Sequence, residues 1–371
     1  MYDSVIIGSS PLCLLEAVCL RRAGRRVIVL DERDRPGGAW GNAGSGRHPF
    51  LDVGCHYWDV DREAYRFLRD RLGIPLAPLR PQPQFLWGPF RFPYDFKQIG
   101  RIVRDVGVFG RTGRFGEWMQ AVFRTDYHRL RPFPFTATFL FPRGGAHAVM
   151  ARLRTILSES GVEVRLATSL EEIVFEAGNR SVALGTSSGR LETRELVMTS
   201  LSRFVRRITP SPDLPEGCVI RRDPTHVNLI LRDPRPRTFS YIRFLRHPDF
   251  DRATDVTDQL NHWGAGRAGR KALCVGVRGD WLRRHPPPSR DEAVLAGLRR
   301  HRLVHEAARI EASYWNVYPM EHLAPEARDA LGRRFAPALR FLPTSNFITG
   351  VVRNLPRWKK AFPMTPERYV C

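Results

Sequence analysis

The stretch that decides the fold is residues 3–31, DSVIIGSSPLCLLEAVCLRRAGRRVIVLD. Its two apolar runs predict buried strands, and the residues between them have a helical period at 12–23. Gly8 opens the turn into the helix, and Asp31 closes the second strand. In such a strand–helix–strand unit the helix N-terminus points at a diphosphate and the acid accepts hydrogen bonds from a ribose. The pattern therefore predicts an adenine dinucleotide as the ligand.

The turn itself keeps only part of the dinucleotide fingerprint G-x-G-x-x-G. Residues 8–13 read GSSPLC, so Ser10 replaces the second glycine and Cys13 the third. A serine narrows the approach of a pyrophosphate, and a cysteine adds a side chain where the helix should pack closely on the strand. The turn alone fits two hypotheses, a dinucleotide site and an ordinary strand–helix–strand unit without a ligand.

The segment after the second strand favours the first hypothesis. Residues 31–40 read DERDRPGGAW, in which an acid and a basic stretch lead into two glycines that let backbone approach an anion closely. This arrangement resembles the amine oxidoreductase superfamily of flavoproteins, in which the acid binds the adenosine ribose of FAD and the R-x-G-G loop lies along its diphosphate. The resemblance implies FAD as the cofactor, bound by Gly8, Ser9, Ser10, Asp31, Glu32, Arg35, Gly37, Gly38, Ala39, Trp40 and Gly350.

Within that superfamily, the start of the chain is most similar to UDP-galactopyranose mutase-like flavoproteins. Residues 54–58, GCHYW, stand where the mutases have a G-x-H loop near the isoalloxazine ring, which implies a catalytic role for His56. By residue type alone, His56 would more often be a structural histidine in an aromatic cluster. Residues 91–96, RFPYDF, resemble the aromatic P-F-N-like stretch of the mutases and make Tyr94 a candidate substrate contact.

Later stretches follow the same order as in the superfamily. Residues 141–202 begin with FPRGG and resemble the return of the chain into the FAD domain. Residues 313–319, SYWNVYP, stand where the mutases have a Y-Y-P element, so Tyr314 and Tyr318 are candidate substrate contacts. An aromatic strand that packs under the flavin domain is the alternative. Residues 346–350, NFITG, resemble the strand and glycine that approach the flavin ribityl chain.

Two departures from the mutases bear on function. Only residues 100–140 are available for the helical insertion that carries a mobile loop over the sugar nucleotide, so much of that lid is missing. At the C-terminal end, Gly350 is followed by Val351 instead of arginine or aspartate, and only residues 353–371 remain for the flavin-contacting helix. Arg353 in this segment is the second catalytic candidate.

These matches predict an α/β fold with a discontinuous Rossmann-like FAD/NAD(P)-binding domain and a smaller α+β mixed-sheet substrate domain. The cofactor domain is expected to comprise residues 1–75, 141–215 and 336–371, and the substrate domain residues 76–140 and 216–335. Between 216 and 335, strands are predicted at residues 225–231, 239–244 and 272–278 and a helix at 289–300, as expected of a sheet-plus-helix substrate domain.

Composition and cysteine usage fit an enzyme-sized globular protein. The chain has 371 residues, of which 43% are hydrophobic, so it can bury a large core and favours two domains over one. Neither a run of about twenty apolar residues nor a signal peptide is visible, so a cytoplasmic location is expected. The six cysteines are scattered without C-x-x-C spacing, so neither a disulfide framework nor a metal site is predicted.

The net charge of +21 raises the question of an anionic partner. All but four of the 59 lysine and arginine residues are arginines, spread along the chain without a basic helix or a nucleic-acid-binding motif. Specific nucleic-acid binding is therefore not predicted, whereas an anionic small-molecule substrate or an anionic membrane surface is compatible with the arginines. The sequence leaves open whether the chain forms a homodimer.

Three functions follow from the residues and the resemblance. The first is an FAD-dependent oxidoreductase that transfers hydride from a small-molecule substrate to the flavin. The second is a UDP-sugar mutase-like, non-redox enzyme in which reduced flavin attacks the anomeric carbon. The third is a degenerate flavoprotein fold without FAD that acts as a partner or scaffold. A hydrolase elbow, a phosphate loop and a zinc-protease motif are all absent from the sequence, which favours cofactor chemistry.

Overall fold

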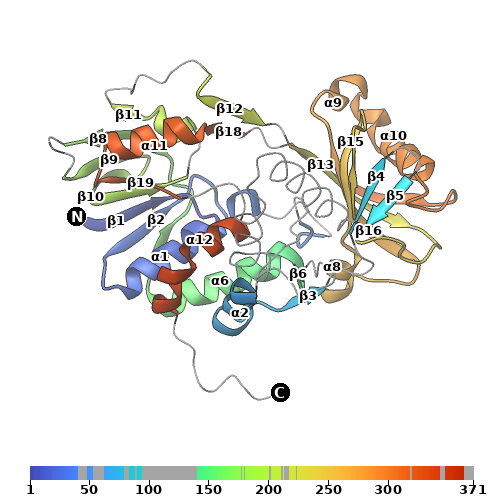
Figure 1. Cartoon of the computed structure of the whole chain (residues 1–371), viewed down its shortest axis with the longest axis horizontal. Helices are drawn as coiled ribbons and strands as arrows, with labels where there is room; N and C mark the ends of the chain where they lie inside the picture. The colour runs from blue at the N-terminus through green and yellow to red at the C-terminus, as the bar shows by residue number, and fades with distance from the viewer. Residues whose placement is uncertain are drawn as a thin grey trace, which may run out of the picture.

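The structure of the chain is a computed structural model. It describes residues 1–40, 48–52, 62–78, 83–87, 90–93 and 140–362, with internal gaps at 177, 179, 200–201, 210–211, 213–216, 223, 318–319 and 343–346. Two large sheets dominate the described residues, and Figure 1 shows them at opposite ends of the molecule.

The first sheet is built around the strand–helix–strand unit expected from the sequence. Its parallel centre comprises β1 (Tyr2–Ile7), β2 (Val27–Leu30), β7 (Glu163–Arg165), β10 (Gly189–Met198) and β19 (Leu339–Phe341). β1 lies between β2 and β10, while β7 pairs with β2 and β19 pairs with the end of β10. β1 and β2 are buried at nearly every position, which is typical of parallel strands covered on both faces.

An antiparallel extension continues this sheet on one side. β8 (Leu170–Phe175) and β9 (Val182–Thr186) form its antiparallel pair, and β11 (Ile208–Thr209) lies outside β8 and runs parallel to it. β10 belongs to both parts, because its first half pairs with β9 and its second half with β1 and β19.

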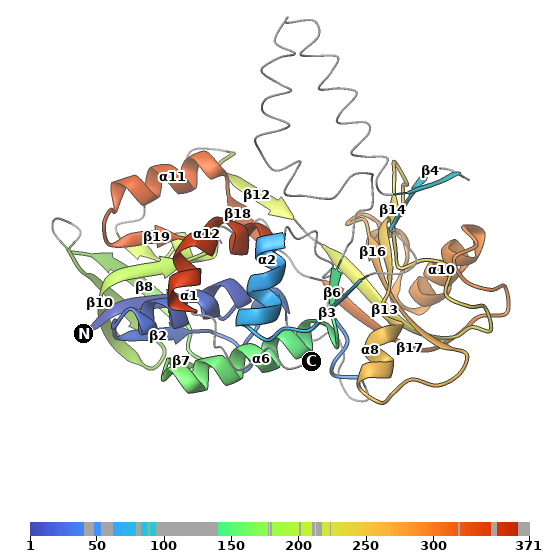
Figure 2. The same ribbon diagram turned by 60° about the horizontal axis from the view of Figure 1, so that its bottom comes forward.

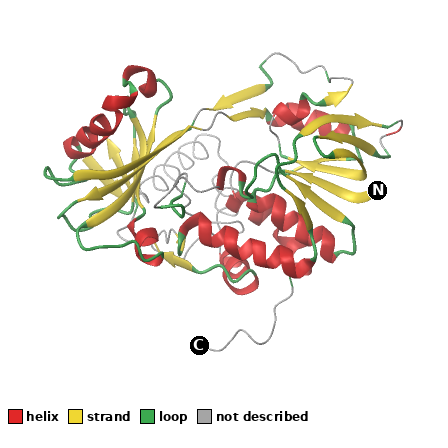
Figure 3. Cartoon of the chain, turned by 180° about the vertical axis from the view of Figure 1, so that it is seen from behind, coloured by secondary structure: helices red, strands yellow, loops and turns green. Residues whose placement is uncertain are grey.

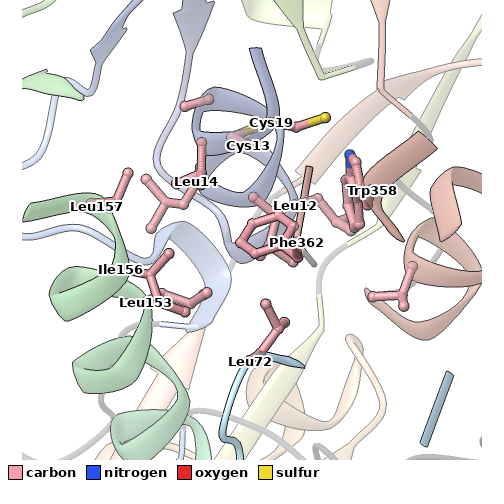
Figure 4. Close-up of a cluster of buried hydrophobic side chains, with 14 of the residues drawn as sticks. Leu12, Cys13, Leu14, Cys19, Leu72, Leu153, Ile156, Leu157, Trp358 and Phe362 are labelled. Carbon is pink, nitrogen blue, oxygen red and sulfur yellow. The ribbon is translucent and has the colours of Figure 1, made fainter. Parts of the chain in front are cut away.

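Helices cover both faces of the first sheet. One face carries α1 (Pro11–Arg22), α6 (Gly145–Ser160), α12 (Phe347–Ala361) and α2 (Arg62–Arg66), which continues into a π-helical turn at Phe67–Arg71. Figure 4 shows Leu14, Ile156 and Trp358, from three of these helices, in one hydrophobic cluster. α1 is buried nearly all round because it lies between the sheet, α6 and α12. The opposite face is covered by α7 (Ser202–Val205) and α11 (Pro325–Arg334).

The second sheet has seven strands in the order β17–β13–β16–β15–β14–β4–β5. Their bounds are β17 Arg309–Val317, β13 Thr225–Arg232, β16 Arg270–Val277, β15 Phe250–Asp255, β14 Tyr241–Phe244, β4 Gln84–Trp87 and β5 Phe90–Pro93. Every neighbouring pair is antiparallel except β14 and β4. α9 (Trp281–Arg284) and α10 (Pro287–Arg300) pack on one face, and α8 (Thr257–His262) and residues 48–52 pack on the other (Figure 2).

Two short strand pairs lie between the large sheets. β12 (Val219–Arg222) pairs with β18 (Met320–Leu323), and β3 (Leu76–Pro78) pairs with β6 (Leu140–Pro142) (Figure 3). The expected α/β class, with a Rossmann-like unit and a second mixed sheet, is confirmed. Among the helices of the described residues, none is both long and apolar enough to cross a membrane.

A charge network fixes the returning strand β19 to the rest of the first sheet. Arg340 in β19 donates from Nε to Oε1 of Glu195 in β10 at 2.7 Å, and from Nη2 to Oε1 of Glu16 in α1 at 2.7 Å. The other carboxylate oxygen of Glu195 lies 2.7 Å from Arg25. Burial acts to raise the pKa of Glu195, but the hydrogen bond and charge of Arg340 and the charge of Arg25 outweigh it and hold that pKa below its usual 4.5.

This network predicts a specific sensitivity to acid. Because the pKa of Glu195 is lower in the folded than in the unfolded chain, its ionised form contributes stability above its unfolded value of 4.5. That contribution is lost as the pH falls through the folded pKa. Glu195→Gln should therefore lower the free energy of unfolding, measured by urea titration, more at about pH 7 than at about pH 3. An equal loss at both pH values would contradict this.

Candidate functional site

The turn between β1 and α1 is held by the acid at the end of β2. Oδ2 of Asp31 accepts hydrogen bonds from the Ser9 backbone N–H at 2.7 Å and from the Ser9 hydroxyl at 2.5 Å. The Ser9 hydroxyl oxygen in turn accepts the Gly37 N–H at 3.0 Å. Ser9 is fully buried and Asp31 nearly so. The serine therefore ties together the turn, the acid and the Gly-Gly loop.

The second oxygen of Asp31 is less occupied. Among the described residues, Oδ1 accepts only the Arg33 backbone N–H, at 2.9 Å, so it keeps a lone pair for another donor. The Arg33 side chain folds back and donates from Nη1 to the Gly38 carbonyl oxygen at 2.7 Å. Gly8, Gly37 and Gly38 have φ values of 94°, 129° and 57°, which favour glycine over residues with a Cβ. The loop is thus folded around a partly free carboxylate.

The N-terminus of α1 supplies hydrogen-bond donors beside this carboxylate. Ser10 is the N-cap residue but makes no capping bond, since its hydroxyl donates to Cys13 Sγ at 3.2 Å. Pro11 has no N–H, so the amides free of intrahelical partners at this end are those of Leu12 and Cys13. They lie at the positive end of the helix dipole, where an anion is stabilised.

Cys13 takes the position of the third glycine without preventing the packing of α1. Its side chain is fully buried in the hydrophobic cluster, with Sγ 3.9 Å from the carbonyl oxygen of Ile7. Burial raises the pKa of the thiol to about 12, opposed by its hydrogen bond with Ser10. The thiol therefore stays protonated at neutral pH and packs as a small apolar group.

An open pocket of about 1140 Å³ lies between residues 32–38 and α6. Its lining includes Arg33, Arg35, His147, Met150 and Arg154. Arg35 is exposed, and its one ion pair within the described part of the chain is a loose 4.0 Å contact with Asp34, so its guanidinium is available to an anion. Glu32, a predicted cofactor contact, also lines this pocket and forms a 2.5 Å ion pair with Arg203 in α7.

The return of the chain brings α12 against the Gly-Gly loop. Gly38, Ala39 and Trp40 form a single 3-10 turn. The Trp40 ring packs against Phe347, the first residue of α12, with ring centroids 4.9 Å apart. This contact joins the loop after β2 to the C-terminal part of the described chain.

The prediction of a strand at residues 346–350 is wrong. Residues 347–350 form the first turn of α12, and the strand that returns to the first sheet is β19. Phe347 and the following buried positions Val351, Leu355 and Trp358 recur at helical spacing. The helical burial period therefore outweighs the local strand preference of a segment with two β-branched residues.

Gly350 in α12 packs directly against Leu12 in α1. A Cβ built on Gly350 would lie 2.5 Å from Cδ1 of Leu12, a distance that real side chains do not show. Gly350 therefore sets the position of α12 against the residue whose amide is free at the start of α1. Arg353, expected to be catalytic, is exposed on α12, and no contact among the described residues ties it to the site.

We expect Gly350→Ala to lower the free energy of unfolding by about 1–3 kcal/mol, because the added methyl group forces α12 away from Leu12. The same displacement should weaken flavin retention. Gly332→Ala in α11 is a matched control, since its Cβ would meet nothing closer than Phe341 at 3.9 Å. That change should be neutral or stabilise by about 0.5–1 kcal/mol. Denaturant titration and flavin content measure both variants, and equal destabilisation of the two would contradict the prediction.

On the second sheet, Tyr314 reaches a segment that precedes the G-x-H loop in the sequence. Its hydroxyl lies 2.8 Å from Nδ1 of His48, and the two rings meet edge to face at 5.9 Å. Phe50 and Leu51 pack in the same cluster as Tyr314. His48 is buried and Tyr314 half-buried. The structure therefore places one predicted substrate contact on the face of the second sheet that packs against residues 48–52.

Asp52 anchors the other end of this segment. Its Oδ1 accepts the Ala146 N–H at the start of α6 at 2.7 Å, and its carbonyl oxygen accepts Nδ2 of Asn228 in β13 at 2.7 Å. Its own N–H donates to Oε1 of Gln259 in α8 at 3.2 Å. Asp52 is fully buried. It joins a helix of the first sheet to a strand and a helix of the second.

His48 and Asp52 were not identified from the sequence as site residues. Their only local signal is a lone histidine and a lone aspartate flanking the apolar pair Phe50 and Leu51. Three other residues predicted for the site, His56, Tyr94 and Tyr318, lie outside the described residues.

Comparisons with known proteins identify the family of this chain. The family model for FAD dependent oxidoreductases (DAO) matches residues 3–342. All-trans-retinol 13,14-reductase of Rattus norvegicus is 34% identical over 95 residues, and putrescine oxidase of Kocuria rosea is 38% identical over 73 residues. These segments are 25% and 19% of this chain, and they span 14% and 15% of the two relatives.

Solved structures resemble the whole architecture. A reduced UDP-galactopyranose mutase superposes with a TM-score of 0.67 at 16% identity, covering 99% of this chain and 97% of that one. A putrescine oxidase variant superposes with a TM-score of 0.64 at 15% identity, covering 97% and 98%. Identities this low show the fold alone. With a family match that runs from β1 to the end of β19, the chain belongs to the FAD dependent oxidoreductase family, and its cofactor is FAD.

Proposed function

We propose that this oxidoreductase transfers hydride from a small-molecule substrate to the flavin of FAD. The observation that carries the proposal is the arrangement of Ser9, Asp31 and Gly37 beside the open N-terminus of α1. There, hydrogen bonds hold the turn in place of two missing glycines. A fold kept only as a scaffold would not need a buried carboxylate with a free lone pair next to unpaired amides.

The residues of this region fit FAD. The amides of Leu12 and Cys13 would hold the diphosphate at the positive end of α1. Oδ1 of Asp31 would accept a ribose hydroxyl, and the guanidinium of Arg35 would offset phosphate charge. When bound, FAD supplies the ring that accepts the hydride.

The substrate would lie against the face of the second sheet that carries Tyr314. Tyr314, together with Tyr94 and Tyr318, would contact it, while His56 and Arg353 would act beside the flavin. The 2.8 Å contact with His48 fixes the direction of the Tyr314 hydroxyl, so His48 is a positioning residue. Tyr314→Phe should raise KM with little change in kcat, because it removes one substrate hydrogen bond and keeps the ring.

The experiment that tests the proposal is a visible absorption spectrum of the purified protein, repeated after FAD addition and after denaturation. FAD released on denaturation would establish the cofactor site. Candidate substrates would then be added anaerobically, where hydride transfer bleaches the flavin absorbance without any added reductant. Turnover that requires prior reduction by dithionite would indicate mutase-like chemistry instead. A colourless protein that ignores added FAD would leave only the scaffold hypothesis.

A further inference from the structure

The outer edge of the second sheet carries a row of exposed apolar side chains. Phe90 in β5 is the cross-strand partner of Trp87 in β4. Leu245 follows Phe244, the partner of Leu86, and its N–H donates to the Leu86 carbonyl oxygen at 2.8 Å, so it stands beside Trp87. Phe90, Trp87 and Leu245, here called the apolar row, are 62%, 55% and 38% exposed. Large apolar side chains grouped on a sheet edge mark a contact surface.

Five arginines lie on or beside the strands that carry the apolar row. They are Arg91, Arg235, Arg243, Arg246 and Arg302, and all are exposed except Arg235, which is half-buried. Within the described residues, none of the five forms an ion pair with a carboxylate. Arg246 and Arg302 have φ values of 54° and 56°, a left-handed backbone conformation in which glycine is the usual residue. Each of these turns therefore carries an arginine where glycine would be free of strain. This end of the sheet is therefore strongly positive, with Arg243 on the face of the apolar row and Arg91 on the opposite face.

Two of these guanidinium groups are held close together. Arg91 donates from Nη2 to the carbonyl oxygens of His301 and Arg302 at 3.0 and 3.1 Å, and Arg235 donates from Nη1 to the same Arg302 oxygen at 2.9 Å. Since both bind one oxygen atom, the two nitrogens lie at most 6.0 Å apart. Partial burial, and then the charges of Arg235 and Arg302, lower the pKa of Arg91. An anion beside this pair would relieve the repulsion.

We propose that the apolar row and its five arginines dock the protein on an anionic phospholipid surface. The tryptophan, phenylalanine and leucine would enter the headgroup region, and the arginines would pair with lipid phosphates. β4 and β5 lie at the end of the molecule away from α1 (Figure 1).

Lipid fits this edge better than nucleic acid or an acidic protein does. Exposed aliphatic and aromatic side chains insert into a bilayer without a complementary pocket, whereas nucleic acid offers an aliphatic side chain little to bind. The net charge of +21 adds long-range attraction to an anionic surface. A short apolar row binds lipid weakly by itself, so both features are needed together.

The test is co-sedimentation of the flavin-loaded full chain with vesicles. The protein should bind vesicles of equal parts phosphatidylcholine and phosphatidylserine, bind phosphatidylcholine alone weakly, and dissociate as salt is raised. The double variant Trp87→Ser, Phe90→Ser should bind at least about tenfold more weakly. Arg91→Gln and Arg246→Gln should each lose about fivefold. None of these changes should alter the flavin spectrum.

Matched controls replace an exposed apolar residue and an exposed arginine elsewhere. Ile220→Ser in β12, at a residue 39% exposed, and Arg333→Gln in α11 should leave binding unchanged. No binding to anionic vesicles, equal losses in the controls, or full binding by the aromatic double variant would each overturn the proposal. If the double variant fails to fold, the insertion of Trp87 can be tested by the quenching of tryptophan fluorescence by brominated lipid. This quenching should be weaker in the Trp87→Phe variant than in the unaltered protein. Unchanged quenching in that variant would also overturn it.

Discussion

Asp31→Ala should yield a purified protein that retains no flavin, with FAD affinity reduced at least about a hundredfold. The carboxylate holds the turn before α1 through two bonds from Ser9 and one from Arg33, and its remaining lone pair faces the place proposed for the ribose. Hydrogen bonds to a charged group contribute about 1.5–3 kcal/mol each, so losing the ribose bond and the order of the turn costs about 3 kcal/mol or more. Flavin content after purification and titration with FAD measure the effect.

Two further variants make this prediction specific. Asp31→Asn should be nearly as defective, because both carboxylate oxygens accept N–H groups and the amide would turn an NH2 toward one of these donors. Glu159→Gln is the control, since Glu159 is an exposed residue of α6 and should be dispensable for FAD. Normal flavin content in Asp31→Ala, or an equal loss of flavin in the Asp31 variants and the control variant, would contradict the role assigned to Asp31.

The first strand–helix–strand unit could be predicted because all its determinants lie within residues 3–31. Two apolar runs, a helical period and a terminal acid are local signals, and they produced the correct fold class. The consequence of serine at position 9 could not be predicted in the same way. Ser9 and Gly37 are 28 residues apart, and only the folded turn places the hydroxyl of one beside the N–H of the other.

In the second sheet, sequence patterns predict individual strands but not how the strands pair. The apolar residues at 225–231 and 272–278 predict strands, and β13 and β16 lie there. The strand order could not be read, because β4 and β5 come from residues 84–93 and join the sheet edge through one parallel pairing. His48 and Asp52 were missed for the same reason, since their partners Tyr314 and Asn228 come from this sheet, far along the chain.

The return helix α12 is held to α1 by a buried acid that the sequence does not single out. Glu16 is fully buried in α1, and its two oxygens receive Arg340 from β19 and Arg357 from α12. Trp358 also donates from Nε1 to Glu16 at 3.1 Å. One carboxylate thus joins the first helix, the returning strand and the returning helix.

Glu16→Ala should lower the free energy of unfolding by about 3 kcal/mol, because removing one partner leaves Arg340 and the Trp358 N–H without their buried acceptor. Arg357 is 41% exposed and can turn to water, so the cost should lie toward the lower end for a broken buried pair. Denaturant titration measures the loss, and flavin affinity should fall with it as α12 shifts from α1. Glu159→Ala, at an exposed glutamate of α6, should change stability by less than about 0.5 kcal/mol.

A double-mutant cycle with Arg340→Ala tests whether the two residues act together. The stability lost in the double variant should be smaller than the sum of the losses in Glu16→Ala and Arg340→Ala, because both changes remove the same ion pair. Additive losses would show that Glu16 and Arg340 act independently and that the carboxylate does not fix the returning strand.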